Sequence, residues 1–223
     1  MGYQSYNFLI NTVSDGAVNE AIRKYAGGKL LDIGCGEKPF EEIAKLVVTA
    51  HIGVDHISTL HDKSRIDIFA TAYDLPFESE SFDSVLCTGV LTQLEEPSVA
   101  IAAAFRVLKP GGYAIYYANL YWHLAEEPRD FYRYTKYGLR YLFLKNGFEI
   151  VEIKPISGFC VTFLQELVYF LYDYPQFRRG RILRRWILPP IGFALQSGGL
   201  LLNKIDHSET FTVAYLAVAR KPG

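Results

Sequence analysis

Cysteine is scarce in this chain, and its spacing excludes two kinds of protein. The 223 residues include three cysteines, Cys35, Cys87 and Cys160. None of them belongs to a CxxC pair, and the count is odd, so neither a disulfide framework nor a zinc site is expected. We therefore predict a protein that holds no metal and folds in a reducing cytosol.

The chain also lacks a dominant charge and an apolar leader. Its 23 basic and 24 acidic residues sum to −1, so nucleic acid is not an expected partner. The opening residues, MGYQSYNFLINTVSDG, have no basic start followed by an apolar run, which predicts a cytoplasmic protein without a signal peptide. With 50% hydrophobic and 21% charged residues, the composition is globular.

Strands and helices alternate along most of the sequence. Strands are predicted at 29–34, 51–56, within 65–73, and at 81–89, 112–119, 148–157 and 211–221. Helices are predicted at 15–26, 40–48, 97–108 and from the cap Thr135 to Gly147. This alternation is typical of a doubly wound α/β fold, a parallel sheet with helices on both faces.

Residues 158–207 break the alternation. They begin with an apolar, aromatic helix candidate at 161–174 and end with an uncharged run at 186–203. Five arginines stand between these two segments: Arg178, Arg179, Arg181, Arg184 and Arg185. The uncharged run borders on membrane-spanning length, but its Pro-Pro and Gly-Gly pairs argue against an uninterrupted spanning helix.

We interpret 158–207 as a helical insertion into a domain formed by 1–157 and 208–223. Three roles are open for the insertion. It can cap the active site, form a homodimer surface, or contact anionic lipid through 178–203, because basic residues beside an apolar face suit the headgroup layer. The third role would make the protein membrane-associated.

The strongest chemical signal is LLDIGCG at 30–36. Asp32 ends an apolar strand, and the two glycines that follow let the backbone approach a ligand and direct amide N–H groups at it. Pro39 stands where a dinucleotide motif has its third glycine, which argues against a nicotinamide-dependent oxidoreductase. Asp55 ends the next strand and can accept two hydrogen bonds from ribose hydroxyls, although it could also serve a turn or a helix cap.

Four motifs stand in a specific order: LLDIGCG, IGVDH, AYDLPFESESFDSVLC and RVLKPGG. In this order the chain resembles the class I S-adenosylmethionine-dependent methyltransferases, of the type 11-like kind, over roughly 20–155 and the final strand. The resemblance implies a Rossmann-like, seven-stranded, mostly parallel sheet with an antiparallel last strand. It also implies S-adenosylmethionine as cofactor and a small-molecule acceptor. GCGEKPF and EPRDFYRYT resemble a subgroup associated with surface-polysaccharide or lipid-linked glycan pathways, which implies a glycan or lipid-linked acceptor.

The resemblance also assigns binding residues. The methionine portion of the donor would be cradled by Asp32, Gly34, Cys35 and Gly36. Asp55 would hold the ribose, and the adenine would lie beside His56 and Ile57 and be flanked by Asp74 and Leu75. Thr88 and Gly89 would line the floor below the sulfonium.

Residues 119–135 are the expected acceptor side, because they leave the carboxyl end of a strand. His123 is the candidate general base, since its unperturbed pKa lies near neutrality; it could instead be a hydrogen-bonded loop histidine. Arg133 could pair with a phosphate or carboxylate of the substrate, or form a structural ion pair with Asp130 or Glu127.

Two departures from the family pattern leave another function open. Thr71 stands where relatives often have an acid that meets the adenine amino group, and Gln93 stands where they often have histidine. Glutamine cannot accept a proton. The alternative is therefore a catalytically inactive binding or scaffold protein with the methyltransferase fold.

Overall fold

The computed structural model describes residues 6–173, 183–206 and 208–223. These form two compact units. The core unit comprises Ala17–Leu120, Leu124–Lys154 and Tyr215–Gly223, and the helical unit comprises Met1–Gly16, Tyr121–His123 and Pro155–Ala214. Helix α1 (Phe8–Tyr25) begins in the helical unit and ends in the core unit.

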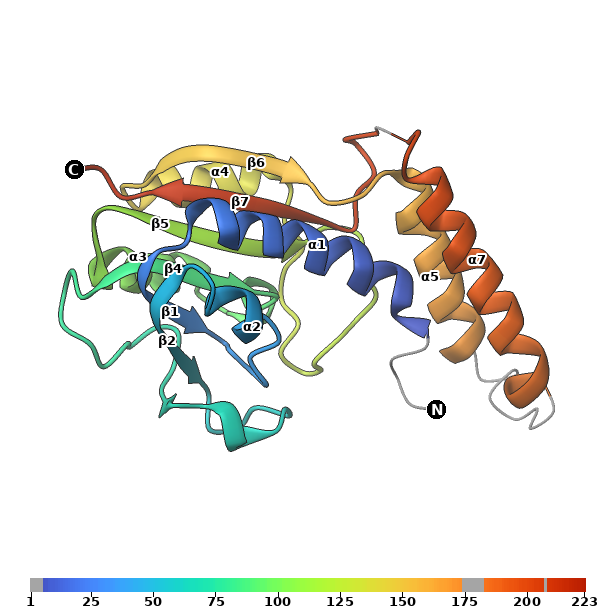
Figure 1. Cartoon of the computed structure of the whole chain (residues 1–223), viewed down its shortest axis with the longest axis horizontal. Coiled ribbons are helices and arrows are strands. Elements are labelled where there is room, and N and C mark those ends of the chain that lie inside the picture. The colour runs from blue at the N-terminus through green and yellow to red at the C-terminus, as the bar shows by residue number, and fades with distance from the viewer. Residues whose placement is uncertain (1–5, 174–182, 207) are drawn as a thin grey trace. The chain divides into compact units, whose positions relative to one another are not determined.

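A seven-stranded sheet in the order β3-β2-β1-β4-β5-β7-β6 organises the core unit (Figure 1). Its strands are β1 (Gly28–Ile33), β2 (Val48–Asp55), β3 (Ile68–Phe69), β4 (Phe82–Thr88), β5 (Leu108–Asn119), β6 (Glu149–Pro155) and β7 (Ala214–Arg220). Strands β1 to β5 pair in parallel, and the β7 arrow runs opposite to that of β6 (Figure 1). The predicted mostly parallel sheet with an antiparallel last strand is confirmed. The strand order reverses between β1 and β4, where such folds bind ligands.

Helices cover both faces of the sheet. Helix α2 (Glu41–Ala44) and the end of α1 lie on one face, and α3 (Pro97–Val107) and α4 (Lys136–Lys145) lie on the other (Figure 1). Short 3-10 turns lie at Lys63–Arg65 and Leu91–Gln93. The central strands are therefore buried on both sides and read as continuous apolar runs; in β7, for example, every residue but Arg220 is buried.

Two predicted boundaries in the core unit hold, and two are wrong. Thr135 caps α4, its hydroxyl accepting a hydrogen bond from the Gly138 N–H at 3.1 Å, and a proline begins α3. The helix predicted over 40–48 is only four residues long, because Val48 already pairs in β2. Strand β5 begins at Leu108, before the Pro-Gly-Gly turn, which the sheet absorbs as a register shift between β4 and β5.

Helix α1 is also longer than predicted, beginning at Phe8 rather than near Asp15. Leu9 is completely buried, and its backbone N–H donates to the side-chain oxygen of Gln196 at 3.0 Å. This contact satisfies an N–H group that the first helical turn leaves without a partner. Burial and this distant partner extend the helix beyond the polar stretch that local sequence suggested as its start.

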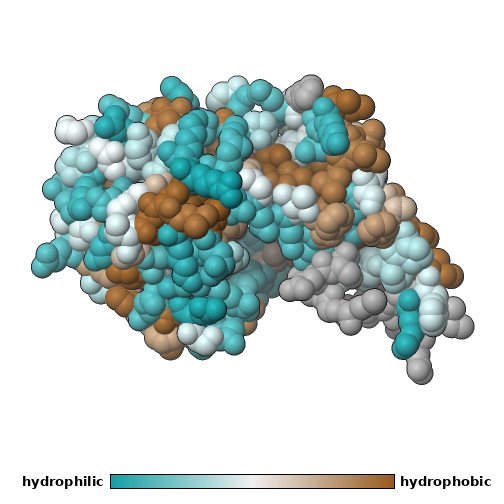
Figure 2. Space-filling model, viewed as in Figure 1, coloured by the Kyte–Doolittle hydropathy of each residue, from teal (hydrophilic) through white to brown (hydrophobic). Residues whose placement is uncertain are grey.

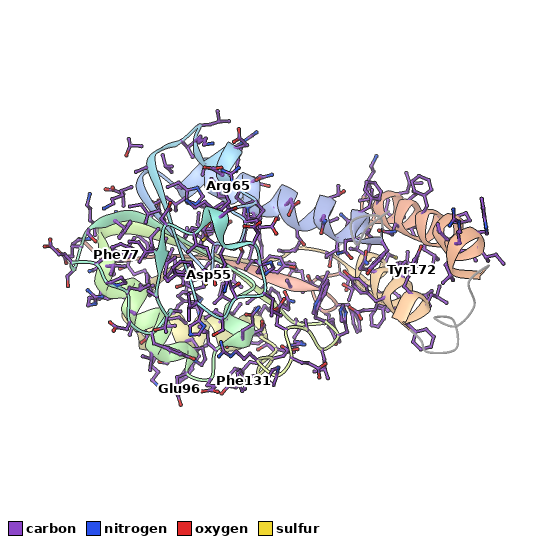
Figure 3. The ribbon with its side chains drawn as sticks, turned by 90° about the horizontal axis from the view of Figure 1, so that it is seen from below. Asp55, Arg65, Phe77, Glu96, Phe131 and Tyr172 are labelled. Carbon is purple, nitrogen blue, oxygen red and sulfur yellow. The ribbon has the colours of Figure 1, made fainter. Side chains whose placement is uncertain are left out.

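The helical unit contains α5 (Phe159–Asp173), a π-helical turn (Leu183–Ile187) and α7 (Leu188–Leu202). Helices α5 and α7 lie side by side (Figure 1), and Tyr172 lies on α5 (Figure 3). A Cβ added to Gly199 would lie 2.7 Å from Leu9 Cδ2, so this glycine permits close packing. None of the helices in the described ranges is long and apolar enough to cross a membrane.

Candidate active site

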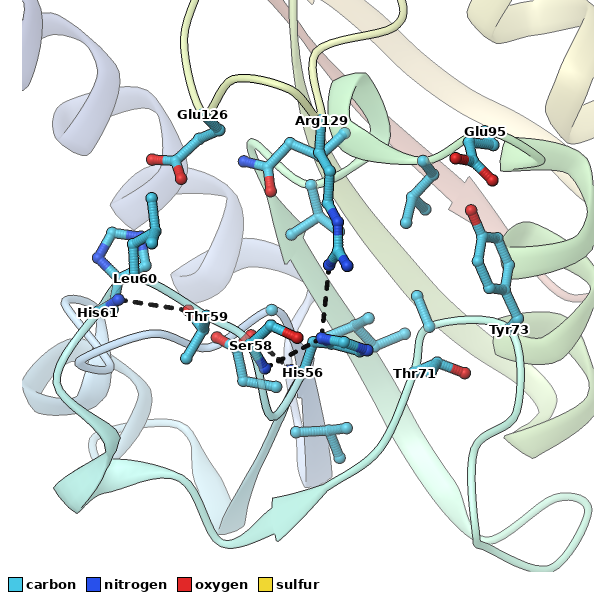
Figure 4. Close-up of a pocket in the computed structure, with 18 of the residues that line it drawn as sticks. His56, Ser58, Thr59, Leu60, His61, Thr71, Tyr73, Glu95, Glu126 and Arg129 are labelled. Carbon is cyan, nitrogen blue, oxygen red and sulfur yellow. Dashed lines mark hydrogen bonds between the residues drawn. The ribbon is translucent and has the colours of Figure 1, made fainter.

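A cavity of about 540 Å³ lies in the core unit at the carboxyl ends of the parallel strands (Figure 4). Its lining comes from within five segments, 33–34, 54–61, 70–73, 88–95 and 126–131. The first four segments follow β1, β2, β3 and β4, and the fifth belongs to the connection after β5. The cavity therefore occupies the switch-point position that the strand order specifies.

The glycine turn after β1 and the carboxylate at the end of β2 are held together. Gly34 has φ +72° and Gly36 has φ +49°, conformations that favour glycine. The Gly36 N–H donates to Asp55 Oδ2 at 2.8 Å, and the His56 N–H donates to Asp55 Oδ1 at 2.7 Å. A Cβ on Gly34 would lie 2.1 Å from Val90 Cγ2, so only glycine fits at this point. Asp55 thus lines the cavity with a fixed orientation.

Four sequence-predicted binding residues line this cavity: Gly34, Asp55, His56 and Thr88. The other predicted residues are not part of its lining: Asp32, Cys35, Gly36, Ile57, Asp74, Leu75 and Gly89. Leu75 is buried at 2% exposure, whereas Ile57 is 59% exposed. Gly36 is close to the site through its bond to Asp55.

Asp32 is buried beneath the glycine turn and bonds to the neighbouring strand. Its Oδ2 atom lies 3.0 Å from His51 Nε2. Burial raises the pKa of Asp32, and the bond to His51 opposes that effect. Cys35 is buried beside this pair, and burial raises the pKa of its thiol to about 12. A thiol with so high a pKa is a poor nucleophile.

An ion pair that the sequence did not predict fastens the glycine turn to the sheet edge. Lys38 Nζ lies 2.6 Å from Asp67 Oδ2, and the lysine side chain is 6% exposed. The same carboxylate oxygen accepts the Gly53 N–H at 2.6 Å. Burial raises the pKa of Asp67, but the bonds from Gly53 and Lys38 outweigh this effect and hold it below its usual value. Lys38 has a φ of +52°, a left-handed conformation that its residue type does not predict.

The segments after β3 and β4 also line the cavity with residues outside the predicted binding set. The segment after β3 contributes Thr71 and Tyr73 to the lining. The hydroxyl of Thr71 accepts a hydrogen bond from the Asp74 N–H at 3.1 Å, so a tight turn directs Asp74 outward to an exposed position. After β4, Gln93 lines the cavity, and its side-chain amide donates to the Gly89 carbonyl at 3.4 Å.

The two predicted catalytic residues lie in different units. Arg133 Nη2 lies 2.7 Å from Asp130 Oδ2 and does not line the cavity, so the pair with Asp130 that the sequence left open is formed. His123 belongs to the helical unit, where its Nδ1 atom lies 3.7 Å from Glu166 Oε2 and its ring centroid 4.4 Å from that of Tyr169. A nearby carboxylate can orient a histidine ring. The role of both residues remains a prediction.

The architecture defines a class of protein. A glycine turn after β1 and a carboxylate at the end of β2, on a sheet ordered β3-β2-β1-β4-β5-β7-β6, are typical of the class I S-adenosylmethionine-dependent methyltransferase fold. Residues 31–116 match the family model described as "Methyltransferase domain". The predicted resemblance is confirmed over these residues, which match the methyltransferase family model.

Known proteins support the same fold. The chain is 31% identical over 117 residues to a ubiquinone biosynthesis O-methyltransferase of Pseudomonas putida, which covers 46% of this chain and 49% of that protein. The match thus spans about half the length of this curated relative. Phosphoethanolamine N-methyltransferase 2 of Haemonchus contortus, solved in complex with S-adenosyl-L-methionine, aligns with a TM-score of 0.59 at 20% identity, over 98% of this chain and 56% of that one.

One similar structure is not described as a methyltransferase. The cyclase SpnF aligns with a TM-score of 0.57 at 20% identity, covering 99% of this chain and 93% of that one. At this identity the likeness concerns the fold alone. The reaction must therefore be argued from the site.

Proposed function

We propose that this protein is an S-adenosylmethionine-dependent methyltransferase that acts on a small-molecule acceptor. The proposal rests on one observation: the glycine turn and Asp55 are hydrogen-bonded to each other, and both contribute to the lining of one cavity. A volume of about 540 Å³ lies within the range of small-molecule sites. Asp55 keeps acceptor capacity for ribose hydroxyls, because each carboxylate oxygen has further lone pairs beyond the bonds to Gly36 and His56.

The charges around the cavity suit this donor. Four carboxylates and one guanidinium line it: Asp55, Glu95, Glu126, Glu127 and Arg129. S-adenosylmethionine supplies a methyl group on a positively charged sulfur, and it carries an ammonium and a carboxylate as well. An acidic lining concentrates a ligand of net positive charge. The same lining disfavours nicotinamide dinucleotides, whose phosphates are anionic.

Each part of the donor would be bound by different residues of this chain. Gly34 and Gly36 let the backbone approach the methionine portion, Asp55 holds the ribose, and Thr71 and Tyr73 border the base. The protein must then align the acceptor with the methyl group and exclude water, because the donor needs no further activation. For an oxygen or nitrogen acceptor, His123 would remove the proton, with Glu166 orienting its ring.

The names of the relatives and two sequence motifs each favour a class of acceptor. Curated relatives named as ubiquinone biosynthesis O-methyltransferases favour a hydroxyl on a small molecule. The GCGEKPF and EPRDFYRYT motifs favour a glycan or lipid-linked acceptor. Both kinds of acceptor are compatible with peripheral contact to a membrane.

We propose that the insertion 158–207 makes this peripheral contact with a membrane. The large side chains Trp186, Phe193 and Leu201 are 69%, 65% and 67% exposed, and Figure 2 shows apolar side chains along α7. The guanidinium of Arg185 lies over the ring of Trp186, 5.8 Å from its centroid. Arg178, Arg179 and Arg181 lie outside the described residues. An apolar surface next to arginines suits an anionic headgroup layer, whereas a homodimer surface is the competing role.

Radiolabelled methyl transfer tests the proposed activity. Purified protein is incubated with methyl-labelled S-adenosylmethionine and a panel of isoprenylated phenols, nucleotide sugars and lipid-linked glycans. Label in one product class supports the proposal and identifies the acceptor. Calorimetry is run in parallel: a protein that does not bind the donor at millimolar concentration is the scaffold alternative, which Thr71 and Gln93 keep open.

A further inference from the structure

The loop at 124–131 presents one arginine to the cavity from a fixed backbone. The carboxylate of Asp130 accepts the Ala125 N–H at 2.8 Å and pairs with Arg133 at 2.7 Å. The Arg129 N–H donates to the Glu126 carbonyl at 2.9 Å. These bonds close the loop on itself, so Arg133 has a structural partner and Arg129 is the arginine that reaches the cavity.

The guanidinium of Arg129 has little to hold it in its present place. In the described part of the chain its side chain makes one hydrogen bond, to His56 Nδ1 at 3.4 Å (Figure 4), which is long for such a bond. Glu126 and Glu127 line the same cavity, yet in the described part of the chain Arg129 forms no ion pair with a carboxylate. An arginine that faces a cavity without an anionic partner is available to a ligand.

His56 indicates which part of a ligand Arg129 would meet. Its Nδ1 atom also accepts the Ser58 N–H at 3.1 Å. His56 directly follows Asp55, the proposed ribose residue, and Arg129 faces it from the other side of the cavity (Figure 4). A nucleoside whose ribose reaches Asp55 would therefore have its base beside His56 and within reach of Arg129.

We propose that Arg129 binds the purine ring of the donor: its guanidinium leaves His56 and packs on the face of the base. This inference rests on the proposed function. A planar guanidinium stacks well on an aromatic ring, and the attraction grows as water is excluded. A phosphate or carboxylate is a poorer occupant, because Glu126 and Glu127 beside the arginine would repel it.

Two ligands that share the nucleoside test the proposal by calorimetry. S-adenosylhomocysteine carries the amino-acid chain, and 5′-methylthioadenosine does not. Arg129→Gln should weaken the binding of both ligands by the same factor, roughly 3- to 30-fold, and Arg129→Lys should lose less because the cation remains. Arg140→Gln, an exposed arginine on α4, is the matched control and should bind both ligands normally.

The possible results separate this inference from the proposed function. If the unaltered protein binds neither ligand, the proposed function fails and this inference fails with it. If it binds both and Arg129→Gln binds both equally well, only the role of Arg129 is overturned. A loss confined to S-adenosylhomocysteine would also overturn it, by assigning Arg129 to the amino-acid chain. The melting temperature of Arg129→Gln should equal that of the unaltered protein, because the arginine side chain makes a single long hydrogen bond within the described residues.

Discussion

Replacing Asp55 with asparagine should abolish most of the affinity for the donor. The substitution keeps the shape of the side chain but removes its charge and replaces one acceptor oxygen with an NH2 group. That group would face either the Gly36 N–H or the His56 N–H, which now donate to the carboxylate at 2.8 and 2.7 Å. Donor would then face donor, and the glycine turn would lose one of its anchors.

The expected size follows from the bonds lost. Two hydrogen bonds from ribose hydroxyls to a charged carboxylate, each contributing about 1.5–3 kcal/mol gross, would be weakened rather than deleted in the amide. We expect a net loss of about 2–4 kcal/mol, or roughly a 30- to 1000-fold rise in Kd. The lost loop anchor should lower the free energy of unfolding by about 1–2 kcal/mol.

Calorimetry with S-adenosylhomocysteine measures the first effect, and urea unfolding measures the second. Glu149→Gln is the matched control, because Glu149 is exposed and does not line the cavity; its Kd should not change. The unaltered protein should bind a 2′-deoxy analogue more weakly than S-adenosylhomocysteine. The Asp55→Asn protein should bind the two ligands with nearly the same affinity. An Asp55→Asn protein that binds S-adenosylhomocysteine normally would refute the assignment of Asp55 to the ribose.

Three further predictions follow from the other contacts. Lys38→Met should lower the free energy of unfolding by about 1–2 kcal/mol near neutral pH. Because the pKa of Asp67 is held low in the folded state, this stabilisation is present above the unfolded pKa near 4 and is lost as pH falls through the folded value; equal urea curves for variant and parent at pH 7 would contradict it. With the acceptor identified, His123→Ala should lower kcat about 100-fold or more while the donor Kd is kept, and normal turnover would show that no base is needed there. In liposome flotation, the protein should rise with anionic but not neutral vesicles, and Trp186→Ser with Phe193→Ser should reduce this; recovery of all protein in the lipid-free fraction would remove the membrane contact.

Local sequence was sufficient to predict the features that depend only on residues adjacent in the chain. The glycine turn, the carboxylate of Asp55 and the cap at Thr135 each depend on a few consecutive residues. The parallel sheet could be predicted as well, because buried strands alternate with helices and leave few topologies. These features brought Gly34, Asp55, His56 and Thr88 to one cavity in the prediction and in the structure.

Distant partners and loop geometry could not be predicted in this way. Gln196 accepts a hydrogen bond at the start of α1 from a residue 187 positions away in the sequence. Lys38 pairs with Asp67, which is 29 positions away. The turn at Thr71 directs Asp74 away from the cavity. Arg133 pairs locally with Asp130, so Arg129 lines the cavity and Arg133 does not. Each outcome depends on a backbone conformation or a partner that residue types alone do not specify.

A crystal structure grown with S-adenosylhomocysteine tests the central claim most directly. The account predicts density for the nucleoside in the cavity after β1 and β2, with both ribose hydroxyls within hydrogen-bond distance of the Asp55 carboxylate and the amino-acid chain against Gly34. Density for the ligand elsewhere, or a glycine turn that side chains close off from it, would contradict the account and leave only the architecture.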